Sequence, residues 1–91
     1  MAIKVEVFSS PGCGNCGHAR EMLRRLAEEI GTGRIAWREI NVLEEMDYAV
    51  SLGVLSTPAI AINGKLEFTS LPSAKKLRQA LEKQLAAGRT G

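Results

Sequence analysis

The chain contains two cysteines, Cys13 and Cys16, which are separated by two residues in a Pro-Gly-Cys-Gly-Asn-Cys-Gly-His segment. Thiolates at this spacing can bind a metal, attach haem, form a structural disulfide or act as a redox couple. A structural zinc site normally needs four ligands, and one chain cannot supply them. Haem attachment requires a histidine at position 17, whereas the only histidine is His18, which we expect to be solvated.

A purely structural disulfide is also a poor explanation for this pair. Closing a four-residue ring stabilises a fold by only about 2 kcal/mol through loop entropy. Structural disulfides are typical of secreted proteins, and the N-terminus here has no secretory pattern. Two inert, buried thiols remain an alternative, but the spacing favours a redox couple.

The elements around the cysteines indicate how the pair is positioned. Residues Ile3–Phe8 predict a strand, and the turn formers Ser9–Gly12 end it. The following helix ends at Gly31. Its apolar stripe recurs every three or four residues and consists of Ala19, Met22, Leu23, Leu26, Ala27 and Ile30.

We therefore expect both cysteines on the first turn of this helix, where free N–H groups and the helix dipole stabilise a thiolate. Cys13 lies at the loop edge and is assigned as the nucleophile, and Cys16 is assigned as the resolving cysteine. Arg20 lies on the same helix face, but we expect its guanidinium to be solvated and too distant to act.

A second strand and a short helix follow. Ile35–Ile40 predicts the strand, and Asn41 with Glu44 resembles a capping box. The short helix would end at Gly53. Its expected apolar residues are Met46, Ala49 and Val50.

The second half of the chain predicts a hairpin and a last helix. Residues 59–62 and 65–68 flank Asn63-Gly64, which fits a type I′ turn. Ser73 is the expected cap of the last helix, and residues 87–91 are expected to fray. The apolar stripe of this helix would be Ala74, Leu77, Leu81 and Leu85.

The element order is β-α-β-α-β-β-α, which predicts an α/β fold with a four-stranded mixed sheet flanked by three helices. The 91 residues fit a single domain spanning positions 1–91. A net charge of +2 and four scattered aromatics do not indicate nucleic-acid binding. No apolar run reaches the roughly 20 residues of a membrane span. Because the N-terminus lacks a secretory pattern, we expect a cytoplasmic protein.

Over residues 3–86 the sequence resembles a small thioredoxin-like protein of the thioredoxin superfamily, of the mini-thioredoxin or glutaredoxin-like kind. The resemblance rests on Cys13–Cys16, on Gly53–Pro58 before the hairpin, and on Asn63-Gly64-Lys65 at its turn. It implies a thioredoxin-like fold in which the Thr57–Pro58 bond is cis and faces the cysteines.

The resemblance also implies which residues meet a substrate. It places Gly12, Thr57 and Pro58 at the substrate-binding surface, with Thr57 able to hydrogen-bond a bound peptide. Gly12 stands where thioredoxins usually carry tryptophan, and Asn15 stands where they carry proline between the cysteines.

The buried acid of the family is also missing, because Val7 occupies its position six residues before Cys13. Such an acid helps to move protons during disulfide exchange. Glu6 or Glu39 could replace it, but we expect each of them to be a solvated strand residue.

The resemblance implies a dithiol–disulfide oxidoreductase that reduces protein disulfides as a monomer. It would bind no cofactor or metal and would take electrons from an external donor of the thioredoxin-reductase type. One alternative is a glutaredoxin-like enzyme that uses glutathione, although Thr69–Pro72 lacks the glycine pair and acidic residue of a glutathione site. Another is a metal or iron–sulfur carrier in which two chains each supply Cys13 and Cys16.

Overall fold

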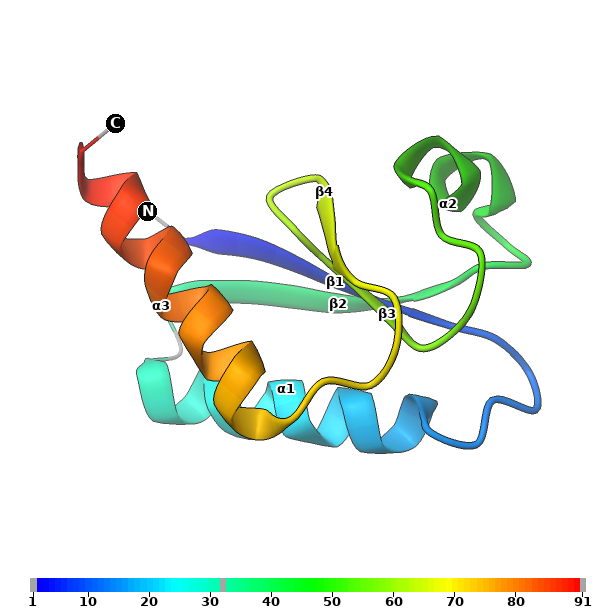
Figure 1. Cartoon of the computed structure of the whole chain (residues 1–91), viewed down its shortest axis with the longest axis horizontal. Coiled ribbons are helices and arrows are strands. Elements are labelled where there is room, and N and C mark those ends of the chain that lie inside the picture. The colour runs from blue at the N-terminus through cyan, green and yellow to red at the C-terminus, as the bar shows by residue number, and fades with distance from the viewer. Residues whose placement is uncertain (1, 32, 91) are drawn as a thin grey trace.

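The structure is a computed structural model that describes residues 2–31 and 33–90, with side chains up to residue 86. The elements are β1 (Ile3–Ser9), α1 (Cys16–Ile30), β2 (Ile35–Asn41), α2 (Met46–Leu52), β3 (Ala59–Ile62), β4 (Lys65–Phe68) and α3 (Ala74–Thr90). The sheet has the order β2-β1-β3-β4, in which only β1 and β2 run parallel within the described part of the chain (Figure 1). The predicted element order and mixed sheet are confirmed.

Strand β1 lies in the middle of the sheet and is covered on both faces. Its residues Val5 and Val7 face α1 and α3, where they join the larger hydrophobic core. Phe8 faces the opposite side, where it packs with Ala49 of α2 and Val54. Figure 1 shows α1 below the sheet and α2 above it, with the start of α3 beside α1.

The β3–β4 hairpin turns at Asn63 and Gly64. Their φ angles are 52° and 81°, so both central residues have the positive values that a type I′ turn requires. The backbone N–H of Asn63 also donates to the carbonyl of Lys4 at 2.7 Å, which ties the turn to β1. The predicted turn is confirmed.

Helix α3 begins after a serine cap, as predicted. The hydroxyl of Ser73 accepts a hydrogen bond from the N–H of Lys76 at 3.2 Å. Leu77 and Leu81 are buried, whereas the predicted core residue Ala74 is exposed, because it stands at the start of the helix before α3 reaches the sheet. The prediction that residues 87–91 fray is not tested, because the side chains of residues 87–90 and the whole of Gly91 lie outside the part of the chain that the structure describes.

The start of α2 differs from the prediction. The side chain of Asn41 does not cap the helix; its Oδ1 accepts a hydrogen bond from the N–H of Leu43 at 2.8 Å. This local turn is the usual competitor of a helix cap for asparagine. Helix α2 therefore begins only at Met46.

Two of the three apolar residues expected on α2 face solvent. Ala49 is buried, but Met46 and Val50 are 54% and 66% exposed. The helix meets the sheet through Ala49 and the partly buried Tyr48 and Leu52, which rotates Met46 and Val50 outward.

In the described residues, no helix is both long and apolar enough to cross a membrane.

Candidate active site

A tight turn fixes the backbone just before Cys13. The N–H of Cys13 donates to the carbonyl of Ser10 at 3.2 Å, which closes a four-residue turn. Pro11 occupies the second position of this turn, and Gly12 occupies the third with a φ of 78°. This is the type II pattern, in which the third residue needs a positive φ and is usually glycine.

Cys13 and Cys16 form a disulfide with their Cα atoms 5.5 Å apart. Cys16 is the first residue of α1 and is only 5% exposed. Cys13 is partly exposed and lies in the preceding loop. The expectation that both cysteines lie on the first helical turn is therefore wrong for Cys13, because the Pro11-Gly12 turn delays the start of the helix.

No negatively charged or capping side chain occupies the N-terminus of α1 beside the cysteines, among the described residues. Among the described residues, no acidic side chain occupies its first turn, and the N-cap residue Asn15 makes no side-chain capping hydrogen bond. The first N–H groups of a helix have no partner within the helix, and they carry the positive end of its dipole. This end of α1 can therefore stabilise a cysteine thiolate.

A second loop meets the cysteine loop through a pair of hydroxyl groups. The Oγ of Ser10 and the Oγ1 of Thr57 are hydrogen-bonded at 2.7 Å, although 47 residues separate them. The Thr57–Pro58 bond is cis, Pro58 is buried, and Thr57 is partly exposed. Ser10 was not singled out from the sequence, since no local pattern reveals a contact over that separation.

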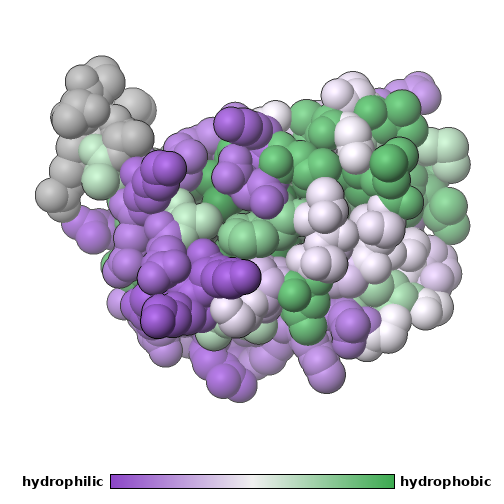
Figure 2. All heavy atoms as spheres, in the orientation of Figure 1, coloured by the Kyte–Doolittle hydropathy of each residue, from purple (hydrophilic) through white to green (hydrophobic). Residues whose placement is uncertain are grey.

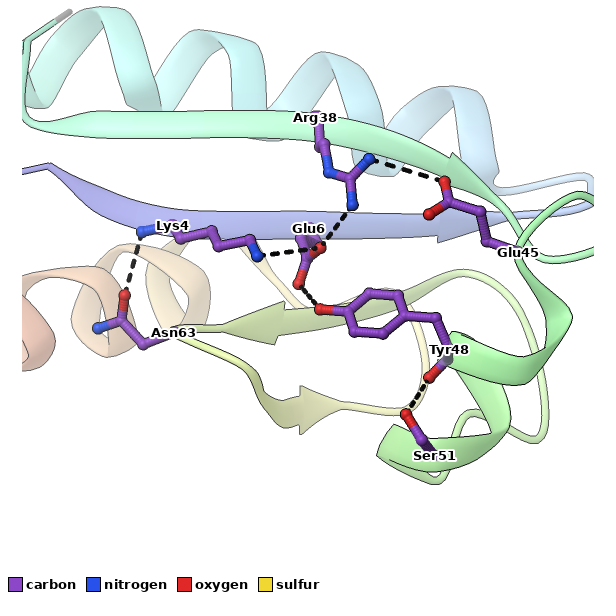
Figure 3. Close-up of polar contacts among 7 residues, drawn as sticks. All are labelled: Lys4, Glu6, Arg38, Glu45, Tyr48, Ser51 and Asn63. Carbon is purple, nitrogen blue, oxygen red and sulfur yellow. Dashed lines mark hydrogen bonds and ion pairs between the residues drawn. The ribbon is translucent and has the colours of Figure 1, made fainter.

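The sequence interpretation of Glu6 as a solvated residue is wrong. Its side chain is fully buried, because it projects from the central strand β1 into the layer beneath α2 (Figure 3). Its carboxylate accepts hydrogen bonds from the hydroxyl of Tyr48 at 2.5 Å and from Nη2 of Arg38 at 3.2 Å. The Nζ of Lys4 lies 3.9 Å away.

This buried acid faces away from α1, whose N-terminal residue is Cys16. Val7, which stands at the family's acidic position, is buried on the α1 face, whereas Glu6 lies on the α2 face. The hydrogen bonds and ion pairs of Glu6 among the described residues are with Tyr48, Arg38 and Lys4, and none of these is a cysteine. Glu6 thus belongs to a polar cluster that joins β1, β2 and α2.

The same cluster shifts the titration of Tyr48. The hydrogen bond that its hydroxyl donates to Glu6 raises the pKa of Tyr48 to about 12. Burial and the negative charge of Glu6 act in the same direction, because each disfavours the phenolate.

Three other polar residues near the site lie at the surface. Arg20 and Glu39 form an ion pair with N–O distances of 3.0 and 3.1 Å, and their side chains are 52% and 33% exposed. Arg20 is therefore paired as well as solvated. His18 is exposed, as predicted. In the part of the chain that the structure describes, no group of three His, Cys, Asp or Glu side chains is placed to hold a metal.

The fold and the cysteine pair define a thioredoxin-like protein with a Cys-x-x-Cys site at a strand-to-helix junction. Two solved structures share this fold with a TM-score of 0.75 and 22% identity. One is described as a malarial protein, and the match covers 92% of this chain and 97% of that one. The other is a mutant thioredoxin from Halobacterium salinarum, with coverage of 89% and 73%.

The sequence comparisons identify the family. The family model described as a thioredoxin domain matches residues 1–82. A thioredoxin of Methanocaldococcus jannaschii is 34% identical over 83 residues, which cover 91% of this chain and 96% of that protein. A probable thioredoxin of Methanothermobacter marburgensis is 33% identical over 85 residues, with coverage of 93% and 99%. The chain therefore belongs to the thioredoxin family and is a thiol–disulfide oxidoreductase.

Proposed function

We propose that this protein reduces disulfides in other proteins, with Cys13 as the nucleophile and Cys16 as the resolving cysteine. The Cys13 thiolate attacks one sulfur of the substrate disulfide, and the other substrate sulfur leaves as a thiolate that takes up a proton. The Cys16 thiolate then attacks the sulfur of Cys13 and releases the second substrate thiolate. Two electrons pass to the substrate, and the Cys13–Cys16 disulfide remains.

The unequal exposure of the two sulfurs carries this assignment. Cys13 is partly exposed in a loop, whereas Cys16 is 5% exposed at the start of α1. A substrate disulfide can approach Cys13 directly, and Cys16 is positioned to attack only after the mixed disulfide has formed. The open N-terminus of α1 supports thiolate formation at this site.

Gly12, Thr57 and Pro58 are proposed as the substrate-binding surface around Cys13. The hydroxyl pair of Ser10 and Thr57 supports this grouping, because it brings the loop before β3 to the loop that carries Gly12 and Cys13. Thr57 remains partly exposed, so its backbone can hydrogen-bond an extended peptide as an added strand. Gly12 has no side chain to obstruct that approach.

The oxidised protein must be reduced again before the next cycle. We propose that an external donor of the thioredoxin-reductase type does this, that the protein needs no bound cofactor, and that it acts as a monomer in the cytoplasm. Glutathione is the competing donor. Recycling of the oxidised protein by NADPH with a thioredoxin reductase, compared with glutathione and its reductase, distinguishes the two.

The cysteine roles are tested by trapping. Cys16→Ser should accumulate mixed disulfides on Cys13 with disulfide-bonded protein substrates, because the resolving step is lost. The matched variant Cys13→Ser should accumulate none. Non-reducing electrophoresis and mass spectrometry detect these adducts. If Cys13→Ser formed the adducts and Cys16→Ser did not, the two roles would be reversed.

A further inference from the structure

The outer side of α2 is apolar, which is unusual for a surface helix. Leu43, Met46 and Val50 are spaced by three and four residues, and they are 59%, 54% and 66% exposed. Met46 and Val50 are four residues apart on α2 and are therefore neighbours on its surface, and Leu43 lies in the turn before the helix. Met46 and Val50 point away from the sheet, since Ala49 is the buried residue of the helix. A surface helix normally presents polar residues in that direction.

A fourth exposed apolar residue follows α2 in the chain. Leu55 is 97% exposed and lies two residues before Thr57. Leu43, Met46, Val50 and Leu55, here called the α2 patch, are the exposed large hydrophobic residues of the part of the chain that the structure describes. Figure 2 shows hydrophobic surface gathered over α2 and the region beside it. Contiguous apolar surface of this kind marks an interaction site.

The charge around the α2 patch is of one sign. Residues 41–64 contain Glu44, Glu45 and Asp47 and no lysine, arginine or histidine. The nearby Arg38 is engaged by Glu6 at 3.2 Å and by Glu45 at 3.6 Å. A second copy of this chain would set two such acidic rims against each other, which disfavours self-association. The patch instead complements a partner with a basic rim.

We infer that the α2 patch docks substrate proteins whose disulfide lies beside an apolar segment flanked by lysine or arginine. The inference rests on the proposed function, because it supplies that function with a substrate class. The apolar segment packs on Met46 and Val50, and the basic flanks face Glu44 and Asp47. Leu55, two residues before Thr57, is the patch residue nearest in the sequence to the redox site.

The test uses three synthetic peptides, each with one disulfide and identical arms on both sides of it. The arms contain leucine with lysine, leucine with glutamate, or serine with lysine. The measured quantity is the second-order rate constant for oxidation of the pre-reduced protein by each peptide. A small aromatic disulfide, too short to reach the patch, reports on the proposed function alone.

The wild-type protein should react fastest with the leucine–lysine peptide. Met46→Gln combined with Val50→Gln keeps good helix formers, and it should lower that rate about tenfold. Glu44→Gln combined with Asp47→Asn should reduce the preference for lysine over glutamate, as should added salt. Glu82→Gln, which removes a single negative charge on α3, should not alter this preference. All variants should reduce the small disulfide at the wild-type rate.

Equal rates for wild type and the Met46→Gln, Val50→Gln variant with every peptide would overturn the docking inference. Sedimentation that shows a dimer dissociated by the same variant would overturn it as well, because a second copy would then cover the patch. Failure of the wild-type protein to reduce the small disulfide would instead refute the proposed function, and the inference with it.

Discussion

A charged residue fully buried in the central strand is costly unless its charge is matched. Glu6 is matched by three groups: the hydroxyl of Tyr48, the guanidinium of Arg38 and the more distant ammonium of Lys4. Arg38 and Lys4 are themselves 53% and 59% exposed, so only the carboxylate gives up its water. Removing one partner of such a buried group leaves an unpaired charge, which destabilises a fold far more than loss of a surface ion pair does.

The Tyr48–Glu6 hydrogen bond predicts a specific pH dependence. The pKa of Tyr48 is raised to about 12 in the folded protein, against about 10 in the unfolded chain. The stabilisation by the hydroxyl is therefore complete below pH 10 and is lost as the pH rises toward 12. Tyr48→Phe should be less stable than wild type at pH 8, and the difference should shrink above pH 10.

Phenolate absorbance measures this directly, because the chain contains a single tyrosine. Its midpoint should lie near 12 in the wild-type protein and should move toward 10 in Glu6→Gln, which removes the negative charge. A folded wild-type midpoint at 10 would contradict the proposed interaction.

The cysteine pair and the turn at Pro11 and Gly12 could be predicted from the sequence, because each depends on residues close together in the chain. The burial of Glu6 could not be predicted, because it depends on Tyr48, which lies 42 residues away. An alternating strand pattern cannot show whether a helix covers the second face of the sheet. The contact between Ser10 and Thr57 is hidden for the same reason.

At the scale of elements, local signals predicted the boundaries well wherever a special backbone geometry is required. The Asn63-Gly64 turn and the Ser73 cap both form as expected. Helix α2 was harder to predict, because Asn41 uses its side chain in a turn and because apolar residues on a short helix do not reveal which side meets the sheet. Met46 and Val50 break the usual pattern, and this break is the basis of the docking inference.

The hairpin turn gives a prediction at this scale. Gly64→Ala should lower the free energy of unfolding by about 1 kcal/mol, because alanine is strained at a φ of 81°. The matched control is Gly33→Ala, since the φ of Gly33 lies outside the left-handed region. Urea denaturation followed by circular dichroism measures both. Equal effects of the two substitutions would contradict a role for the turn geometry.

At the level of the whole molecule, the larger hydrophobic core lies between the sheet, α1 and α3, and the central strand β1 contributes Val5 and Val7 to it. Leu81 is fully buried in that core, whereas Leu85 is only partly buried against it. Leu81→Ala should cost about 3 kcal/mol, a large fraction of the stability of a domain this small. Leu85→Ala should cost about 1 kcal/mol, because it removes less buried apolar surface.

Urea unfolding distinguishes the two variants. The midpoint should fall much further for Leu81→Ala, with an unchanged slope if unfolding remains two-state. Similar midpoints would mean that α3 packs on the sheet differently from the structure described above.

Helix α2 stands apart from this core. One small buried side chain, two partly buried ones and the hydroxyl of Tyr48 hold it to the sheet, while Met46 and Val50 face solvent. We therefore expect α2 to open locally at a lower free energy than the unfolding of the whole domain. We expect that loss of the Glu6–Tyr48 hydrogen bond, as in Tyr48→Phe, would make this local opening more frequent while the sheet and the cysteine pair stay folded.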